Sequence, residues 1–101
     1  MNRKVKISKT TEKKLEKLFD YLLQNWSQKV KTDFIEKLDR SVDLIKVTPE
    51  IFPESDKQVG LHKCVITKQI TLYYRFDAEA VYLITIFDTR QHPKKLRRDL
   101  K

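Results

Sequence analysis

Three short segments in the second half of the chain constrain its fold more than any other feature of the sequence. They read LHKCVIT (61–67), ITLYYRF (70–76) and AVYLITIF (80–87), and they are rich in β-branched and aromatic residues, which favours β-strands. Only two or three residues separate one segment from the next. Because parallel strands need a crossover of a dozen or more residues, these short connections predict an antiparallel meander.

Apolar residues recur at helical spacing in the first half of the chain and predict two amphipathic helices. Ser8, Thr10 and Thr11 are candidate N-caps of the first helix, and Ser27 is a candidate N-cap of the second. Pro49 ends the second helix. So little chain separates the helices that we expect an antiparallel hairpin. The two stripes are Leu15, Leu18, Phe19, Leu22, Leu23 and Trp26, then Val30, Phe34, Ile35, Leu38, Val42 and Ile45.

Two further segments complete the predicted fold. RKVKIS (3–8) alternates charged and apolar residues and predicts a short strand, whereas VTPEIFPESDKQVG (47–60) predicts a loop that holds the only glycine. Residues 1–101 are expected to form one α+β domain. It has an N-terminal strand, the antiparallel helical hairpin, and a twisted sheet with the three-stranded antiparallel meander and both helices on one face. Pro93 suits the start of a short helix or an extended basic tail, about 93–101.

Alternation along the strands assigns their side chains to two faces of the sheet. The wholly apolar sets are expected to face the helices, so the mixed sets line an open face that carries aromatic rings and cations. Such a face suits a single-stranded nucleic acid or another protein chain. The helix-facing set is Leu72, Tyr74, Phe76, Tyr82, Ile84 and Ile86; the open-face set is Thr71, Tyr73, Arg75, Leu83, Thr85, Phe87, Lys63, Val65 and Thr67.

Four single residues have plain structural interpretations. Trp26 ends the first helical stripe and is expected to anchor the core. His62 and Cys64 alternate onto the side of the sheet assigned to the core, so both are expected to be buried. Tyr73 is the tyrosine expected to be exposed.

The formal net charge of +8 lies at the two ends of the chain. Residues 1–17 hold seven Lys or Arg against two Glu, and residues 90–101 hold six against one Asp, which leaves the middle slightly acidic. Separated basic segments raise the local concentration of polyanions and speed encounter with them, although plain solvated tails have the same composition.

The cysteine count bounds the chemistry. Cys64 is the only cysteine, so it has no partner for an internal disulfide or a thiolate metal site. No metal or other cofactor is expected, and a reducing cytosol is the expected compartment. No apolar signal region follows the N-terminus, and no apolar run approaches the ~20 residues that span a bilayer, so no membrane partner is expected.

The order of the elements, with the stretches GLHKCVI, LYYRF and ITIFDTRQHP, resembles the RelE/ParE superfamily over about residues 4–97. These proteins are the toxins of bacterial toxin–antitoxin pairs. The resemblance implies a small twisted antiparallel sheet with the helical hairpin on one side. It also implies a cognate antitoxin that masks the working surface. The toxin could form a homodimer, or a heterotetramer with the antitoxin.

The resemblance leaves the target divided. ParE-like members poison DNA gyrase without cutting RNA, whereas RelE-like members are metal-independent endoribonucleases that cut messenger RNA in the ribosome. RNA cleavage needs a base, an acid and a cation at the phosphate, for which Arg90, His92 and Arg75 are the candidate catalytic residues. RelE-like enzymes keep a further arginine where this chain has Thr71, and a C-terminal tyrosine near the position of Leu96. These departures favour gyrase inhibition, with ribosome-dependent RNA cleavage as the alternative.

Other interpretations remain open. A non-toxic RNA-binding module is a second alternative, although LYYRF lacks the Gly–aromatic run of the common RNA-recognition module. Arg90 could simply pair with Asp88 on the surface, and His92 could cap a helix beside Pro93. The residues expected to bind the target or the antitoxin are Lys63, Tyr73, Arg75, Phe87, Arg90, Lys94, Lys95 and Arg97.

Overall fold

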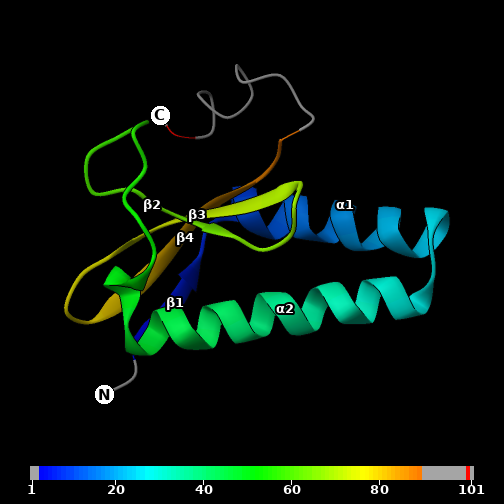
Figure 1. Ribbon diagram of the computed structural model, residues 1–101, viewed down its shortest axis with the longest axis horizontal. Helices are drawn as coiled ribbons and strands as arrows, with labels where there is room; N and C mark the ends of the chain where they lie inside the picture. Colours follow the sequence, from blue (N-terminus) through cyan, green and yellow to red (C-terminus); the bar gives the residue numbers. More distant parts are fainter. Residues whose placement is uncertain (1–2, 90–99, 101) are drawn as a thin grey trace.

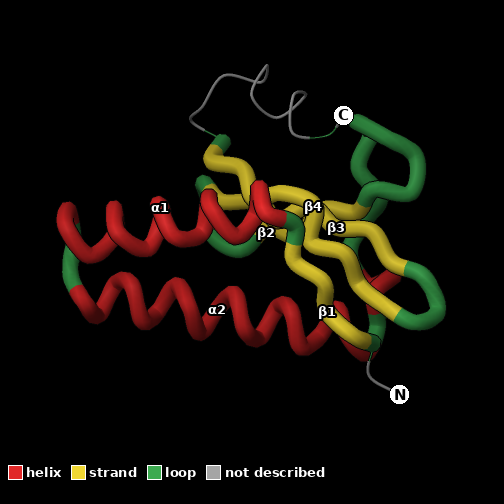
Figure 2. The backbone as a smooth tube through the Cα atoms, turned by 180° about the vertical axis from the view of Figure 1, so that it is seen from behind, coloured by secondary structure: helices red, strands yellow, loops and turns green. Residues whose placement is uncertain are grey.

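The computed structural model describes residues 3–89 and residue 100, and it has the α+β architecture that the sequence predicts (Figure 1). A short strand leads into two long antiparallel helices, which lie together on one side of the sheet (Figure 2). The elements are β1 (Lys4–Ile7), α1 (Lys9–Asn25), α2 (Gln28–Val47), the 3₁₀ turn η1 (Pro49–Ile51), β2 (His62–Val65), β3 (Ile70–Phe76) and β4 (Ala80–Asp88).

The four strands form one mixed sheet in the order β1-β4-β3-β2. The pairs β2/β3 and β3/β4 are antiparallel, as the short connections predict, whereas β1 pairs with β4 in parallel. The expectation of a wholly antiparallel sheet is therefore wrong at this edge. Because β1 and β4 are far apart in the sequence, the helical hairpin can supply the long crossover that a parallel neighbour requires.

Both helices begin at the predicted serine caps. The Ser8 side chain accepts a hydrogen bond from the Thr11 N–H at 3.1 Å, and the Ser27 side chain accepts one from the Val30 N–H at 3.1 Å. Each cap satisfies an N–H that has no partner within its own helix. The helical stripes then pack on the sheet. The buried core is Phe34, Leu38, Ile45, Cys64, Ile66, Ile70, Leu72, Tyr74, Val81, Leu83 and Ile86.

A β-bulge in β4 changes which side chains face the helices. Tyr73 lies opposite Thr85, but Tyr74 lies opposite Leu83, so Ile84 is an extra residue in the pairing with β3. Beyond the bulge the alternation shifts by one residue. Leu83 therefore enters the helix-side core, whereas Ile84 packs with the cluster on the opposite face. The assignments of Leu83 and Ile84 were wrong.

The same shift also moves Tyr82 to the other face, whereas Ile86, Leu72 and Phe76 keep the face predicted for them. Tyr82 pairs directly with Arg75 and so lies on the face away from the helices, contrary to the prediction. Ile86 and Leu72 lie in the helix-side core as predicted, and Phe76 packs against it.

The start of α1 holds the bulge in place. The Ser8 hydroxyl donates a hydrogen bond to the Ile84 carbonyl at 2.8 Å, and the Thr11 hydroxyl donates one to the Leu83 carbonyl at 3.1 Å. Thr11 is fully buried, and the Ser8 N–H also donates to the Leu83 carbonyl. The carbonyls of Leu83 and Ile84, at the bulge, thus accept hydrogen bonds from the start of α1, which satisfies their need for a partner. We call this arrangement the bulge clamp.

The face opposite the helices is not bare, as the sequence led us to expect. Leu61, Tyr73, Phe87 and Leu100 form a second buried cluster there, with Ile84 partly buried against it. Tyr73 is only 7% exposed, so the expectation that it is exposed was wrong.

Trp26 does not anchor the core, because its side chain is 66% exposed. Figure 1 shows that the turn between α1 and α2 lies beyond the end of the sheet. The apolar stripe of α1 continues past the point where the sheet can cover it.

Replacing Thr11 by valine keeps the shape of the side chain and removes the hydroxyl of the bulge clamp. Because the site is fully buried, no water replaces the lost donor to the Leu83 carbonyl. We expect the free energy of unfolding to fall by about 1–3 kcal/mol. Urea unfolding followed by circular dichroism measures this, and Thr10→Val, exposed in the same helical turn, is the matched control. Equal losses in the two variants would contradict the clamp.

Burial raises the pKa of Tyr74, so the fold should weaken at alkaline pH. An unfolded tyrosine loses its proton near pH 10, whereas folded Tyr74 keeps it, so stability declines as pH rises, by up to about 1.4 kcal/mol per pH unit. Tyr74→Phe removes this dependence and the 2.5 Å bond from the hydroxyl to the Pro49 carbonyl. Urea unfolding across the alkaline range should show the gap between wild type and variant narrowing as pH rises. A gap that stays constant would contradict the prediction.

Candidate functional site

The candidate site is the sheet face opposite the helices, together with the loop from η1 to β2. Arg75, Tyr73 and Phe87 lie on this face, and Lys63 projects from the neighbouring β2 with an exposed side chain. The remaining predicted site residues lie outside the described residues: Arg90, His92, Lys94, Lys95 and Arg97.

Arg75 is engaged by the loop rather than directed at solvent. Its Nη1 donates to the Val59 carbonyl at 2.8 Å, and its Nη2 donates to the Gln58 side-chain carbonyl. Gly60 has a φ of 78°, and a Cβ there would lie 3.1 Å from Arg75 Nη1. The only glycine therefore supplies both a left-handed backbone angle and room for the guanidinium.

The loop folds back onto the edge of β2 like an added half-strand. The Lys63 N–H donates to the Pro53 carbonyl at 3.0 Å, and the Ser55 N–H donates to the Leu61 carbonyl at 2.5 Å. Glu54 forms an isolated bridge with His62 and accepts from the Gly60 N–H at 3.1 Å. Part of the β2 edge is thereby already paired.

The aromatic residues of the site are buried. Burial raises the pKa of Tyr73, and the negative charge of Asp56 raises it further, so Asp56 in the loop acts on a phenol of β3. Phe87 is 6% exposed. Both rings pack in the second buried cluster with Leu61 and Leu100, and neither offers an open stacking platform.

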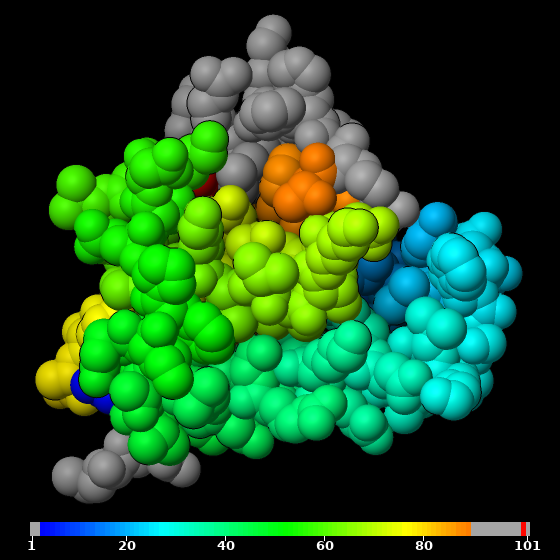
Figure 3. All heavy atoms as spheres, viewed as in Figure 1, coloured from blue at the N-terminus to red at the C-terminus, as the bar shows by residue number. Residues whose placement is uncertain are grey.

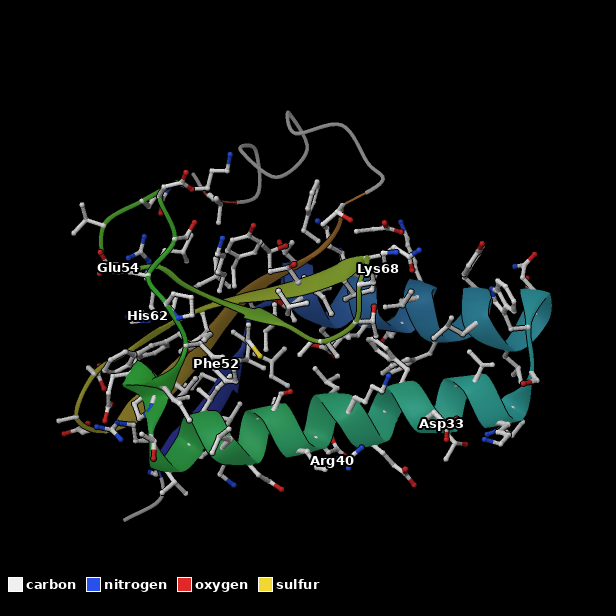
Figure 4. The ribbon with its side chains drawn as sticks, viewed as in Figure 1. Asp33, Arg40, Phe52, Glu54, His62 and Lys68 are labelled. Carbon is white, nitrogen blue, oxygen red and sulfur yellow. The ribbon has the colours of Figure 1, made fainter. Side chains whose placement is uncertain are left out.

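His62 and Cys64 lie on the helix side of β2, and Cys64 is buried as predicted, whereas His62 is only half-buried, contrary to the prediction. The His62 ring stacks on Tyr74 with centroids 5.4 Å apart, and its Nδ1 lies 2.8 Å from the Phe52 carbonyl, to which it donates (Figure 4). Cys64 is fully buried, and burial raises the pKa of its thiol. Neither residue supplies an acid, a base or a nucleophile to the face of the candidate site.

Residues 3–89 and 100 contain neither a metal-binding cluster nor a membrane-spanning helix. This part of the chain brings together no group of three or more His, Cys, Asp or Glu side chains that could hold a metal ion. None of its helices is both long and apolar enough to cross a bilayer.

Sequence reasoning missed two features of the surface. One is Gln58, which links Arg75 to the carbonyl of Leu100 and has no recognisable motif. The other is a hollow between the two helices and the β2–β3 turn, visible in Figure 3, whose lining includes Trp26 and Val30. The helical stripe running past the sheet was the available signal for this hollow, but we had assigned Trp26 to the core.

The sequence model of the family described as "ParE toxin of type II toxin-antitoxin system, parDE" matches residues 5–93. Comparison with curated protein sequences finds no match.

Solved structures share the fold at low sequence identity. The chromosomal ParDE system of P. aeruginosa matches with a TM-score of 0.70 and 9% identity, over 85% of this chain and 95% of that one. A mutant of the E. coli toxin RelE in the free state matches with a TM-score of 0.67 and 13% identity, over 98% and 94%. The E. coli DinJ-YafQ toxin–antitoxin complex matches with a TM-score of 0.63 and 10% identity, over 89% and 96%.

These structural likenesses show the fold alone, whereas the family match covers most of the chain. The resemblance seen in the sequence is confirmed: the chain belongs to the ParE toxin family of type II toxin–antitoxin systems.

Proposed function

We propose that this toxin inhibits DNA gyrase by binding it, without a catalytic step, and that a cognate antitoxin neutralises it in the cytoplasm. The toxin role and the antitoxin partner follow from the family. The choice of gyrase as target is the proposal. The gyrase target carries over from the ParE-like resemblance. The structural relatives include both ParE and RelE, so they do not choose between the two targets.

The engagement of Arg75 is the observation that carries this proposal. A nuclease needs a guanidinium directed at the scissile phosphate, but the Arg75 guanidinium donates to Val59 and Gln58 of the loop. Thr71, at the position where RelE-like enzymes keep a further arginine, is 7% exposed. The described part of this face thus offers phosphate little stabilisation beyond the exposed Lys63.

Acid–base chemistry is equally sparse on this face. His62 packs between aromatic rings on the other side of the sheet. In the RNA-cleaving alternative, His92 would therefore act as acid or base, with Arg90 at the phosphate and Leu96 in place of the tyrosine that stacks on the base. Inhibition by binding requires none of these roles.

The predicted binding residues take simpler parts in this proposal. Lys63 and the basic residues Arg90, Lys94, Lys95 and Arg97 would contact the target or the antitoxin, since basic segments speed encounter with acidic surfaces and DNA. Tyr73 and Phe87 would support this surface from below.

His92→Gln separates the two mechanisms, because it keeps a polar side chain and removes the acid–base function. Gyrase inhibition predicts that the variant arrests bacterial growth to within about twofold of wild type, whereas loss of a general acid or base costs about 10²–10⁴-fold in rate. Growth on induction, with RNA integrity and plasmid supercoiling measured in parallel, is the assay. Cleaved transcripts in wild type that become intact in the variant would overturn the proposal.

Purified components give a direct second test. The wild-type protein should inhibit supercoiling of relaxed plasmid by DNA gyrase, and its cognate antitoxin should restore activity. Arg90→Ala and Arg98→Ala remove one charge each from the same basic segment, so they form a matched pair. If the segment acts through charge, both should weaken inhibition similarly. Undiminished supercoiling at saturating wild-type protein would contradict the proposed target.

A further inference from the structure

Leu100 occupies an apolar socket on the sheet face opposite the helices. Leu61, Tyr73 and Phe87 form the socket, and each is at most 7% exposed; Leu100 itself is 8% exposed. Ile84, the extra residue of the bulge, packs at its edge. Leu100 is thus as buried as Ile66 of the helix-side core.

A polar contact fixes the main chain of Leu100. The Gln58 side-chain N–H donates to the Leu100 carbonyl at 2.6 Å, while the Gln58 side-chain oxygen accepts from Arg75. Because a guanidinium can only donate, the Gln58 oxygen must face Arg75 and its NH₂ group must face the carbonyl. Arg75 therefore orients a donor for a peptide carbonyl at the mouth of the socket.

We propose that Gln58, Leu61, Tyr73 and Phe87 form a peptide-binding socket that recognises one leucine-type side chain together with its own carbonyl. The resident ligand is Leu100, bound within the same chain. The wholly apolar wall selects the side chain, and the oriented amide of Gln58 selects the carbonyl, as in pockets where a few polar groups fix the ligand's orientation.

Leu100 and a free peptide would compete for the same socket. Leu100 lies in a turn rather than in a helix or strand. A ligand tethered by a short linker acts at an effective concentration of about millimolar. A peptide in solution must exceed that concentration to displace Leu100. The surface that this face offers to a partner therefore depends on whether Leu100 occupies the socket.

The test uses the full chain and a synthetic acetylated peptide with the sequence of residues 97–101, RRDLK. Leu100→Ala empties the socket, so the peptide should bind this variant saturably and shift the NMR signals of Leu61, Tyr73 and Phe87. Wild type should bind it at least about tenfold more weakly, because Leu100 competes. The same peptide with alanine in place of leucine should bind neither protein.

Two further variants check the recognition. Adding Gln58→Leu to Leu100→Ala should weaken peptide binding about tenfold, the usual cost of one lost hydrogen bond. Adding Val65→Ala, an exposed position on β2, should leave binding unchanged. Equal binding to wild type and Leu100→Ala, equal binding of both peptides, or loss of the folded circular dichroism spectrum in Leu100→Ala would overturn the proposal. Since gyrase is absent from the assay, failure here would leave the proposed target unaffected.

Discussion

The bulge clamp between α1 and β4 determines which side chains reach each face of the sheet. Hydroxyls of Ser8 and Thr11 bind the carbonyls of Ile84 and Leu83, and one extra residue in β4 then reverses the alternation. Without the bulge, Leu83 would leave the core and Ile84 would enter it. The position of Tyr82 beside Arg75, and the second cluster behind it, depend on the same shift.

On the face created in this way, the Arg75 guanidinium makes two hydrogen bonds to the loop. It donates to Val59 and Gln58 of the loop, and Gln58 passes that orientation on to the chain end at Leu100. A charged side chain in a network of this kind fixes a conformation. In this ParE-family toxin, Arg75 thus connects the loop to Leu100 on the face opposite the helices.

The helices, their caps and the three meander strands could be predicted because each follows from local patterns. Periodicity set the helices, and short connections set the antiparallel pairs. The faces of β4 could not be predicted, because the bulge depends on hydroxyls more than 70 residues away in the sequence. The prediction that Trp26 anchors the core was wrong for a different reason. Periodicity indicates an apolar stripe on a helix but does not indicate where the sheet beneath that helix ends. At the candidate site, the sequence marked Arg75 but had no signal for its partner Gln58.

The bulge in β4 is tested most directly by measuring nuclear Overhauser contacts from the methyl groups of this strand. The account predicts contacts from Ile84 to the ring of Tyr73 and from Leu83 to the ring of Tyr74. Contacts from Ile84 to Tyr74, with Leu83 directed toward Tyr73, would mean that β4 has no bulge and that the two faces are assigned wrongly.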